Sequence, residues 1–228
     1  MNTMRMFACL TLASMLPAPA AWAIDLGSVG GGSMVVPLKT WKEARFVATV
    51  RQQYDFSCGS AALATLLSHH YAFPVTEQVV FEEMYAKGDQ QKIRQQGFSL
   101  LDMQRFLAVR GFHADGFQLP LEKLIEAKVP AIVLVSDQGY NHFVVIKGIA
   151  DGRILLGDPS KGARAISAER FRELWISKIL FVIHGYQGTV AFNGPADWRA
   201  APLAPLAQAM APHGLDVNAL PKYGPGDF

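Results

Sequence analysis

The hydrophobic pattern of this chain changes near Pro130, and that change restricts the fold more than any other feature of the sequence. Before it, apolar residues recur at helical spacing; after it, short β-branched or aliphatic runs alternate with turn residues. Helices are expected at residues 58–70, 77–87, 99–110 and 121–127. Strands are expected at residues 131–135, 142–149, 153–156 and 179–183, interrupted by a helix at 167–175. Helices followed by a mostly antiparallel sheet predict an α+β domain of two packed layers.

The predicted helices carry recognisable ends. Ser57 is placed as the N-cap of the first helix, and Thr76 and Gly88 mark the start and end of the second. Ser99 and Asp102 have the spacing of a capping box, and Gly111 is positioned to stop that helix. These signals make the N-terminal half predominantly helical.

Residues 1–23 are typical of a cleavable signal peptide. Arg5 precedes an apolar run at 6–16, and Ala21-Trp22-Ala23 forms a small-residue cleavage site. The run is too short to span a bilayer. We therefore expect a periplasmic protein, exported and not embedded in a membrane.

The rest of the chain divides into three parts. Residues 24–49 are interpreted as an N-terminal arm with β-prone pieces at 34–36 and 46–50, and residues 50–184 as the folded domain. Residues 185–228 are rich in proline and alanine and predict an extended C-terminal extension. Once Arg5 is removed with the signal, 20 basic residues face 19 acidic ones. That balance gives no electrostatic argument for binding nucleic acid or an anionic membrane surface.

Cysteine usage is more informative than charge. Cys9 leaves with the signal peptide, so Cys58 is the one thiol in the exported chain and no internal disulfide can form. A lone cysteine is either a small buried hydrophobe or a reactive group. Its position decides between the two, because a thiol at a helix N-terminus is stabilised as thiolate by the macrodipole and nearby N–H groups. We therefore predict a lowered pKa for the Cys58 thiol.

The residues around Cys58 suit attack on a carbonyl. The backbone N–H of Cys58 can donate to the oxyanion that such attack creates, and the side-chain amide of Gln52 can supply a second donor. Gly59 has no side chain and is expected to let a substrate backbone approach closely.

Two further residues complete a possible triad. His142 opens a predicted strand directly after a turn, where it is expected to face a cleft, and Asp158 ends the next strand in Gly157-Asp158-Pro159. Adjacent antiparallel strands would bring Asp158 to the imidazole N–H and fix the tautomer that accepts the thiol proton.

Each of these residues alone has an ordinary explanation. His142 could sit at a sheet edge, Asp158 could accept hydrogen bonds within a turn, and Gln52 could be a solvated loop residue. Their order and their fit to the predicted elements favour a cysteine nucleophile site. A metal site is not predicted, since His69 and His70 are adjacent and project apart on a helix, and no cofactor is expected.

The stretch from Val50 to Ile183 resembles the papain-like, bacteriocin-processing cysteine peptidases that remove leader peptides after a double glycine. That family has a Gln six residues before Cys-Gly, a His-Phe-Val-Val strand and an Asp-Pro turn. These map onto Gln52, Cys58-Gly59, residues 142–145 and Asp158-Pro159. The signal peptide makes the chain more similar to stand-alone periplasmic members, including those encoded with functional-amyloid secretion systems, than to the peptidase domains of ATP-driven exporters.

The resemblance implies a cysteine endopeptidase that cleaves an exported polypeptide, with an outer-membrane secretion system as a further partner. Uncharged flanks such as Phe56, Tyr140 and Phe143 predict a narrow slot that admits small residues. Two alternatives remain open. One is a cell-wall amidase or endopeptidase, and the other is a non-catalytic, peptidase-like chaperone or gating partner of a secretion system.

Overall fold

The computed structural model describes residues 23–26, 34–37 and 40–202, and the chain divides into two compact units, residues 1–40 and 41–228. In the first unit, β1 (Ala23–Leu26) and β2 (Met34–Pro37) pair antiparallel, with Ile24 opposite Val36. The strand predicted at 34–36 is therefore confirmed. Apart from Ala23, the predicted signal peptide lies outside the described residues, as does the end of the predicted extension from residue 203.

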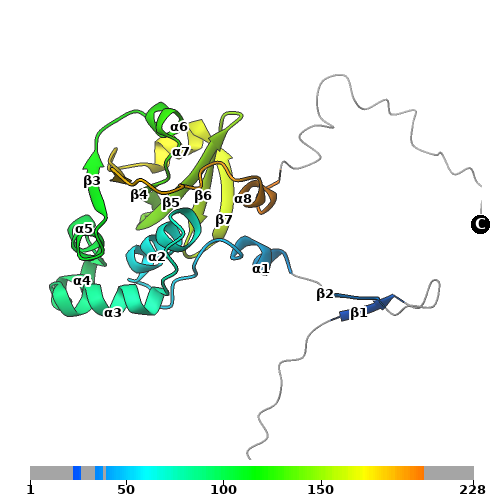
Figure 1. The fold of residues 1–228 in the computed structure, drawn as a ribbon, viewed down its shortest axis with the longest axis horizontal. Coiled ribbons are helices and arrows are strands. Elements are labelled where there is room, and N and C mark those ends of the chain that lie inside the picture. Colours follow the sequence, from blue (N-terminus) through cyan, green and yellow to red (C-terminus); the bar gives the residue numbers. More distant parts are fainter. Residues whose placement is uncertain (1–22, 27–33, 38–39, 203–228) are drawn as a thin grey trace, which may run out of the picture. The chain divides into compact units, whose positions relative to one another are not determined.

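The second unit is built on a six-stranded antiparallel sheet in the order β3-β8-β4-β5-β6-β7 (Figure 1). Four consecutive strands form a meander: β4 (Ala131–Asp137), β5 (Tyr140–Ala150), β6 (Arg153–Asp158) and β7 (Gly162–Ser167). The last strand, β8 (Leu180–His184), returns beside β4 and also pairs with β3 (His113–Phe117). All pairings are antiparallel, as the sequence predicts.

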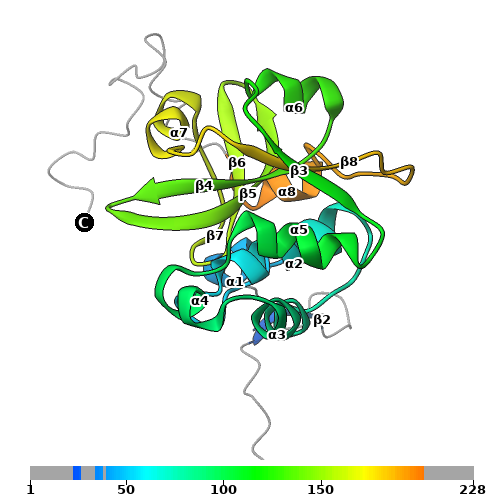
Figure 2. The same cartoon turned by 90° about the vertical axis from the view of Figure 1, so that its left-hand side faces the viewer.

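Helices cover both faces of this sheet (Figure 2). One face packs on α2 (Cys58–His70) and α5 (Leu100–Ala108), with α3 (Glu77–Lys87) packed on these two helices. The other face packs on α6 (Glu122–Ala127) and α7 (Ala168–Leu174). Alternation along β5 explains the two cores, because Phe143 and Val145 point into the first and Val144 and Ile146 into the second. The sequence predicted two packed layers, whereas helices on both faces of the sheet make three layers.

Helix α2 lies at the centre of the first core. Eleven of its thirteen residues are buried, and its small side chains, such as Ala61 and Ala64, let neighbouring elements approach closely. A helix that is buried all round needs no amphipathic stripe, which agrees with its continuous apolar sequence. The position fixes the N-terminal residue, Cys58, against the sheet.

Helix predictions at 58–70 and 77–87 are confirmed at those bounds, and Ser99 and Asp102 form the predicted capping box of α5. The strand predicted at 46–50 is wrong: helix α1 (Trp41–Arg45) is followed there by a turn and a loop. The elements that were not predicted include β1, α1, α4 (Gln90–Gln96), β3 and β7.

The segment after β8 packs closely on the sheet. Asn193 bonds the backbone of Ile149 in both directions, its Oδ1 accepting at 2.7 Å and its Nδ2 donating at 3.1 Å. In the short helix α8 (Pro195–Arg199), Asp197 accepts a hydrogen bond from Lys147 of β5. Residues 190–199 of the predicted extension thus continue the fold. Within the described ranges, no helix is both long and apolar enough to cross a membrane.

Candidate active site

Cys58 lies at the first turn of α2 and is 6% exposed. The backbone N–H groups of Phe143 and Gly59, and its own, point at the sulfur and favour the thiolate. Burial opposes them and is the larger effect, so the pKa of the Cys58 thiol is raised. The predicted lowering of this pKa is therefore wrong, because the site is drier than the sequence suggested.

Ser57 precedes α2 but does not cap it with its side chain. Its hydroxyl instead donates to the carbonyl of Tyr54 at 3.0 Å and accepts the N–H of Tyr54 at 3.1 Å. The carbonyl of Ser57 accepts a further bond from Ser60 Oγ at 2.8 Å. These bonds hold the loop that leads into Cys58 in one conformation.

The β4–β5 hairpin positions the histidine. Gln138 and Gly139, at the centre of its two-residue turn, both have positive φ, which is the geometry that a tight hairpin requires. The register places His142 opposite Val135 and brings the next residue, Phe143, to the Cys58 sulfur. The start of β5 and the start of α2 therefore meet.

The imidazole of His142 and the carboxylate of Asp158 are paired, with Nε2 3.2 Å from Oδ2. The adjacency of β5 and β6 produces this contact, as expected from the sequence. The other ring nitrogen, Nδ1, is buried and has no hydrogen-bond partner among the described residues. His142 is 2% exposed, so the expectation that it faces an open cleft is wrong.

Asp158 is fully buried and heavily hydrogen-bonded. Its Oδ1 accepts from the N–H and hydroxyl of Ser160 at 3.0 and 2.7 Å and from the N–H of Lys161 at 3.2 Å. Burial disfavours the charged carboxylate, but the bonds from His142 and Ser160 outweigh it and hold the pKa of Asp158 well below its usual range. The carboxylate is thus a fixed negative charge behind the imidazole.

Gln52 lies in the loop before α2 and is tied to the Asp158 turn, since its N–H donates to the carbonyl of Pro159 at 3.1 Å. Its side-chain Nε2 donates to the carbonyl of Tyr54 at 3.1 Å, and its buried Oε1 has no partner within the described part of the chain. The amide carries a second N–H, which this bond does not use. Gln52 is therefore anchored near the other three residues.

Tyr140, which the sequence indicated only as an uncharged flank of the predicted slot, contacts His142 directly. Its ring stacks on that of His142, with centroids 5.5 Å apart and planes at 23°, and its hydroxyl donates to the carbonyl of Asp55 at 2.5 Å. Tyr140 precedes His142 by two residues on one strand, so both side chains share a face. That spacing was the signal available in the sequence.

The expected role of Gly59 is wrong. Gly59 is buried, and a Cβ at that position would lie 2.9 Å from Met103 Cε and 3.0 Å from Phe98 Cβ. Its lack of a side chain lets α2 pack against α5 and the residues before it. Substrate access is not what requires glycine here.

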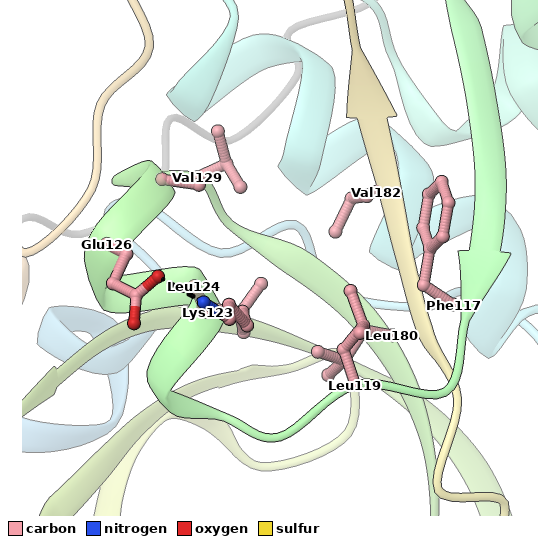
Figure 3. A pocket seen from close by; sticks show the side chains of 9 residues that line it. Phe117, Leu119, Lys123, Leu124, Glu126, Val129, Leu180 and Val182 are labelled. Carbon is pink, nitrogen blue, oxygen red and sulfur yellow. Dashed lines mark hydrogen bonds and ion pairs between the residues drawn. The ribbon is translucent and has the colours of Figure 1, made fainter.

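No group of three or more potential metal-ligating side chains is found in the described residues. His70 is instead held by the C-terminal segment, with Nδ1 2.6 Å from the carbonyl of Ala191. Elsewhere, an apolar pocket of about 460 Å³ lies between α6, β3 and β8 (Figure 3). Its charged members, Lys123 and Glu126, are paired with each other at 2.6 Å, so it offers no catalytic group.

A buried thiol at a helix N-terminus, next to a strand whose histidine is held by an aspartate, is the arrangement of a papain-like cysteine peptidase. The sequence agrees with this class. The profile of the peptidase C39 family matches residues 47–186, and the chain belongs to that family.

Two relatives and one solved structure are similar to this chain. The chain is 39% identical over 156 residues to a probable functional amyloid protease, FapD, of Pseudomonas aeruginosa, covering 68% of this chain and 69% of that protein. It is 37% identical over 192 residues to the protein of the same name from Pseudomonas fluorescens, covering 82% and 84%. The peptidase domain of Streptococcus ComA, a bifunctional ABC transporter of a quorum-sensing pathway, has a TM-score of 0.50 at 22% identity, covering 60% of this chain and 96% of that domain. That likeness shows the fold.

Proposed function

We propose that this protein is an exported endopeptidase that cleaves a secreted polypeptide after small residues, with Cys58 as nucleophile and His142 as base. Asp158 would orient the imidazole, and Gln52 would donate to the oxyanion. The observation that carries this assignment is the 3.2 Å bond between His142 Nε2 and Asp158 Oδ2 beside the buried thiol. In this assignment Asp158 accepts from Nε2–H of His142, and Nδ1 would act as the base.

The reaction follows from that tautomer. Cys58 Sγ attacks the scissile carbonyl carbon while its proton passes to His142 Nδ1, and the N–H of Cys58 and the second amide N–H of Gln52 donate to the oxyanion. His142 then gives the proton to the leaving amine, and water hydrolyses the thioester. Because burial raises the pKa of the thiol, we expect proton transfer to accompany attack and not to precede it.

The surroundings of the thiol support small residues before the cut. Phe143 lies in the same core cluster as Cys58, the ring of Tyr140 stacks on His142, and Phe56 packs against that core. A narrow, aromatic and uncharged slot excludes branched side chains by steric clash and gives cationic ones no partner. The resemblance to double-glycine peptidases supports the same preference.

The biological setting is proposed from the sequence and the relatives. The predicted signal peptide supports a periplasmic location, and the names of the two Pseudomonas relatives support a polypeptide of functional-amyloid export as substrate. A partner in an outer-membrane secretion system fits that setting.

A peptide library varied at the two residues before the cut tests the specificity. We expect cleavage after Gly-Gly or Gly-Ala, lost in Cys58→Ala. Preferred cleavage after Arg, Lys or a large apolar residue would contradict the proposal.

Mass spectrometry of exported proteins from cells carrying wild type or Cys58→Ala identifies the substrate. Peptides released only by the wild type are expected. Release of cell-wall fragments would favour an amidase, and normal export with Cys58→Ala would favour the non-catalytic chaperone.

A further inference from the structure

Arg164 contacts the carboxylate of Asp158 but has no role in the function proposed above. It lies on β7, in register with Leu156 of β6, and its side chain is 18% exposed. Its Nε and one terminal nitrogen lie 3.2 and 3.1 Å from Asp158 Oδ2. The same oxygen accepts from His142 Nε2 at 3.2 Å. One carboxylate oxygen is thus shared between the imidazole and a guanidinium.

The shared oxygen matters because the site is buried. Proton transfer from Cys58 to His142 creates a thiolate and an imidazolium whose charges cancel, whereas the carboxylate of Asp158 would leave one unbalanced negative charge. An unbalanced buried charge disfavours formation of another of the same sign. Accordingly, the charge of Asp158 raises the pKa of the Cys58 thiol.

We propose that Arg164 is a positioning residue of the Cys58–His142 pair: its guanidinium fixes Oδ2 of Asp158 toward His142 and balances the carboxylate charge in the buried site. This inference rests on the proposed function, since it takes Cys58 and His142 as the reacting pair. With Arg164 present, the four side chains together are neutral before and after proton transfer.

The charged groups around Arg164 provide a second way to test the proposal. Asp137, at the end of β4, lies with Oδ2 3.7 Å from a terminal nitrogen of Arg164 and 2.6 Å from Lys161 Nζ. The negative charge of Asp137 therefore offsets part of the positive charge that Arg164 presents to Asp158. Tyr140, which stacks on His142, is a further titratable group at the site. Removing the charge of Asp137 should act in the opposite sense to removing that of Arg164.

A purely structural role is the competing explanation, since Arg164 also ties β7 to the end of β6. The two explanations predict different pH dependences of the reactivity of Cys58. Loss of a structural tie lowers reactivity at every pH, whereas loss of a positive charge shifts both titration steps of the thiol–imidazole pair to higher pH.

The test is the rate at which iodoacetamide alkylates Cys58 as a function of pH, followed by mass spectrometry on the peptide that contains this residue. In Arg164→Gln, we expect the profile to move to higher pH by on the order of one unit. Arg164→Lys keeps the charge and should hold the wild-type profile, even where the rate falls. Asp137→Asn should move the profile to lower pH, and Arg172→Gln, which removes an exposed cation on α7, should leave it in place.

A profile that stays fixed in Arg164→Gln while the rate drops would overturn the proposal and leave a structural role. If Arg164→Gln does not fold, Asp137→Asn provides the test. A pH profile of alkylation that does not move to lower pH in Asp137→Asn would overturn the proposal. The assay uses no substrate, so a peptide library that contradicts the specificity leaves this result standing. A rate and profile unchanged by His142→Ala would instead refute the reacting pair, and with it the proposed function.

Discussion

The ring of Tyr140 lies against the imidazole of His142, with centroids 5.5 Å apart. The same side chain reaches across the site, where its hydroxyl donates to the carbonyl of Asp55 in the loop before Cys58. Tyr140 thus links the hairpin that carries His142 to the loop that leads into Cys58. Because Cys58 and His142 are both buried, we expect a reagent to reach the thiol through an opening of this link.

We predict that Tyr140→Phe speeds alkylation of Cys58 by a bulky maleimide, because the link is lost while the ring on His142 is kept. A several-fold increase is expected, since one neutral hydrogen bond contributes about 1 kcal/mol. A small reagent such as iodoacetamide serves as the control and should respond less. Equal acceleration of both reagents would indicate a change in thiol reactivity and contradict the gating role.

Gln52 yields a second prediction. Gln52→Ala should reduce turnover about 10²- to 10³-fold, because one oxyanion donor is lost, with little change in stability. Gln53→Ala is the matched control, since Gln53 is exposed and adjacent. Steady-state kinetics on a cleaved peptide measure both. A harmless Gln52→Ala beside a damaging Gln53→Ala would show that the donor is misassigned.

The sequence predicted elements whose own residues specify them. The helix at 77–87 has Thr76 accepting from the N–H of Val79 at one end and Gly88 at the other, and both signals are local. The contact between His142 and Asp158 was also predictable, because consecutive antiparallel strands become neighbours.

Elements held by distant partners were missed. Helix α4 buries only Ile93, so its sequence has no apolar stripe, and β3 buries only Ala114. The depth of the site was missed for the same reason. The burial of Cys58 and the position of Arg164 depend on strands brought together by the fold, and no local pattern encodes them.

The ion pair between Lys147 and Asp197 is expected to contribute strongly to stability. Lys147 is fully buried on β5, and its Nζ also donates to the carbonyl of Ala48 at 2.6 Å. Asp197→Ala leaves this ammonium without its counter-charge, which should cost about 3–5 kcal/mol. Urea unfolding measures the change.

Two further variants sharpen that measurement. Lys147→Met combined with Asp197→Ala should cost less than the sum of the single changes, because the pair is removed together. Glu126→Ala, which breaks an exposed pair with Lys123, should have little effect. Strict additivity of the double variant would show that the two side chains are not coupled.

The burial of His70 leads to a prediction of how the free energy of unfolding depends on pH. It is 1% exposed on α2, and burial lowers its pKa from the ordinary histidine value of 6.5 to about 4, with the nearby charge of Lys147 acting in the same direction. His69 is shifted in the same direction, and Asp197 opposes the shift of both. The folded state therefore holds His70 neutral where the unfolded chain would protonate it.

Between pH 6.5 and pH 4 the unfolded state binds more protons at His70 than the folded state, so the free energy of unfolding must fall as the pH falls. The contribution is fully present above pH 6.5, and the 2.5-unit difference corresponds to a loss of about 3 kcal/mol by pH 4. His70→Asn keeps a donor for the carbonyl of Ala191 but does not titrate, so its stability should vary less across this window. Urea unfolding of both proteins at half-unit pH steps tests this, and parallel curves for wild type and His70→Asn would contradict the assignment to His70.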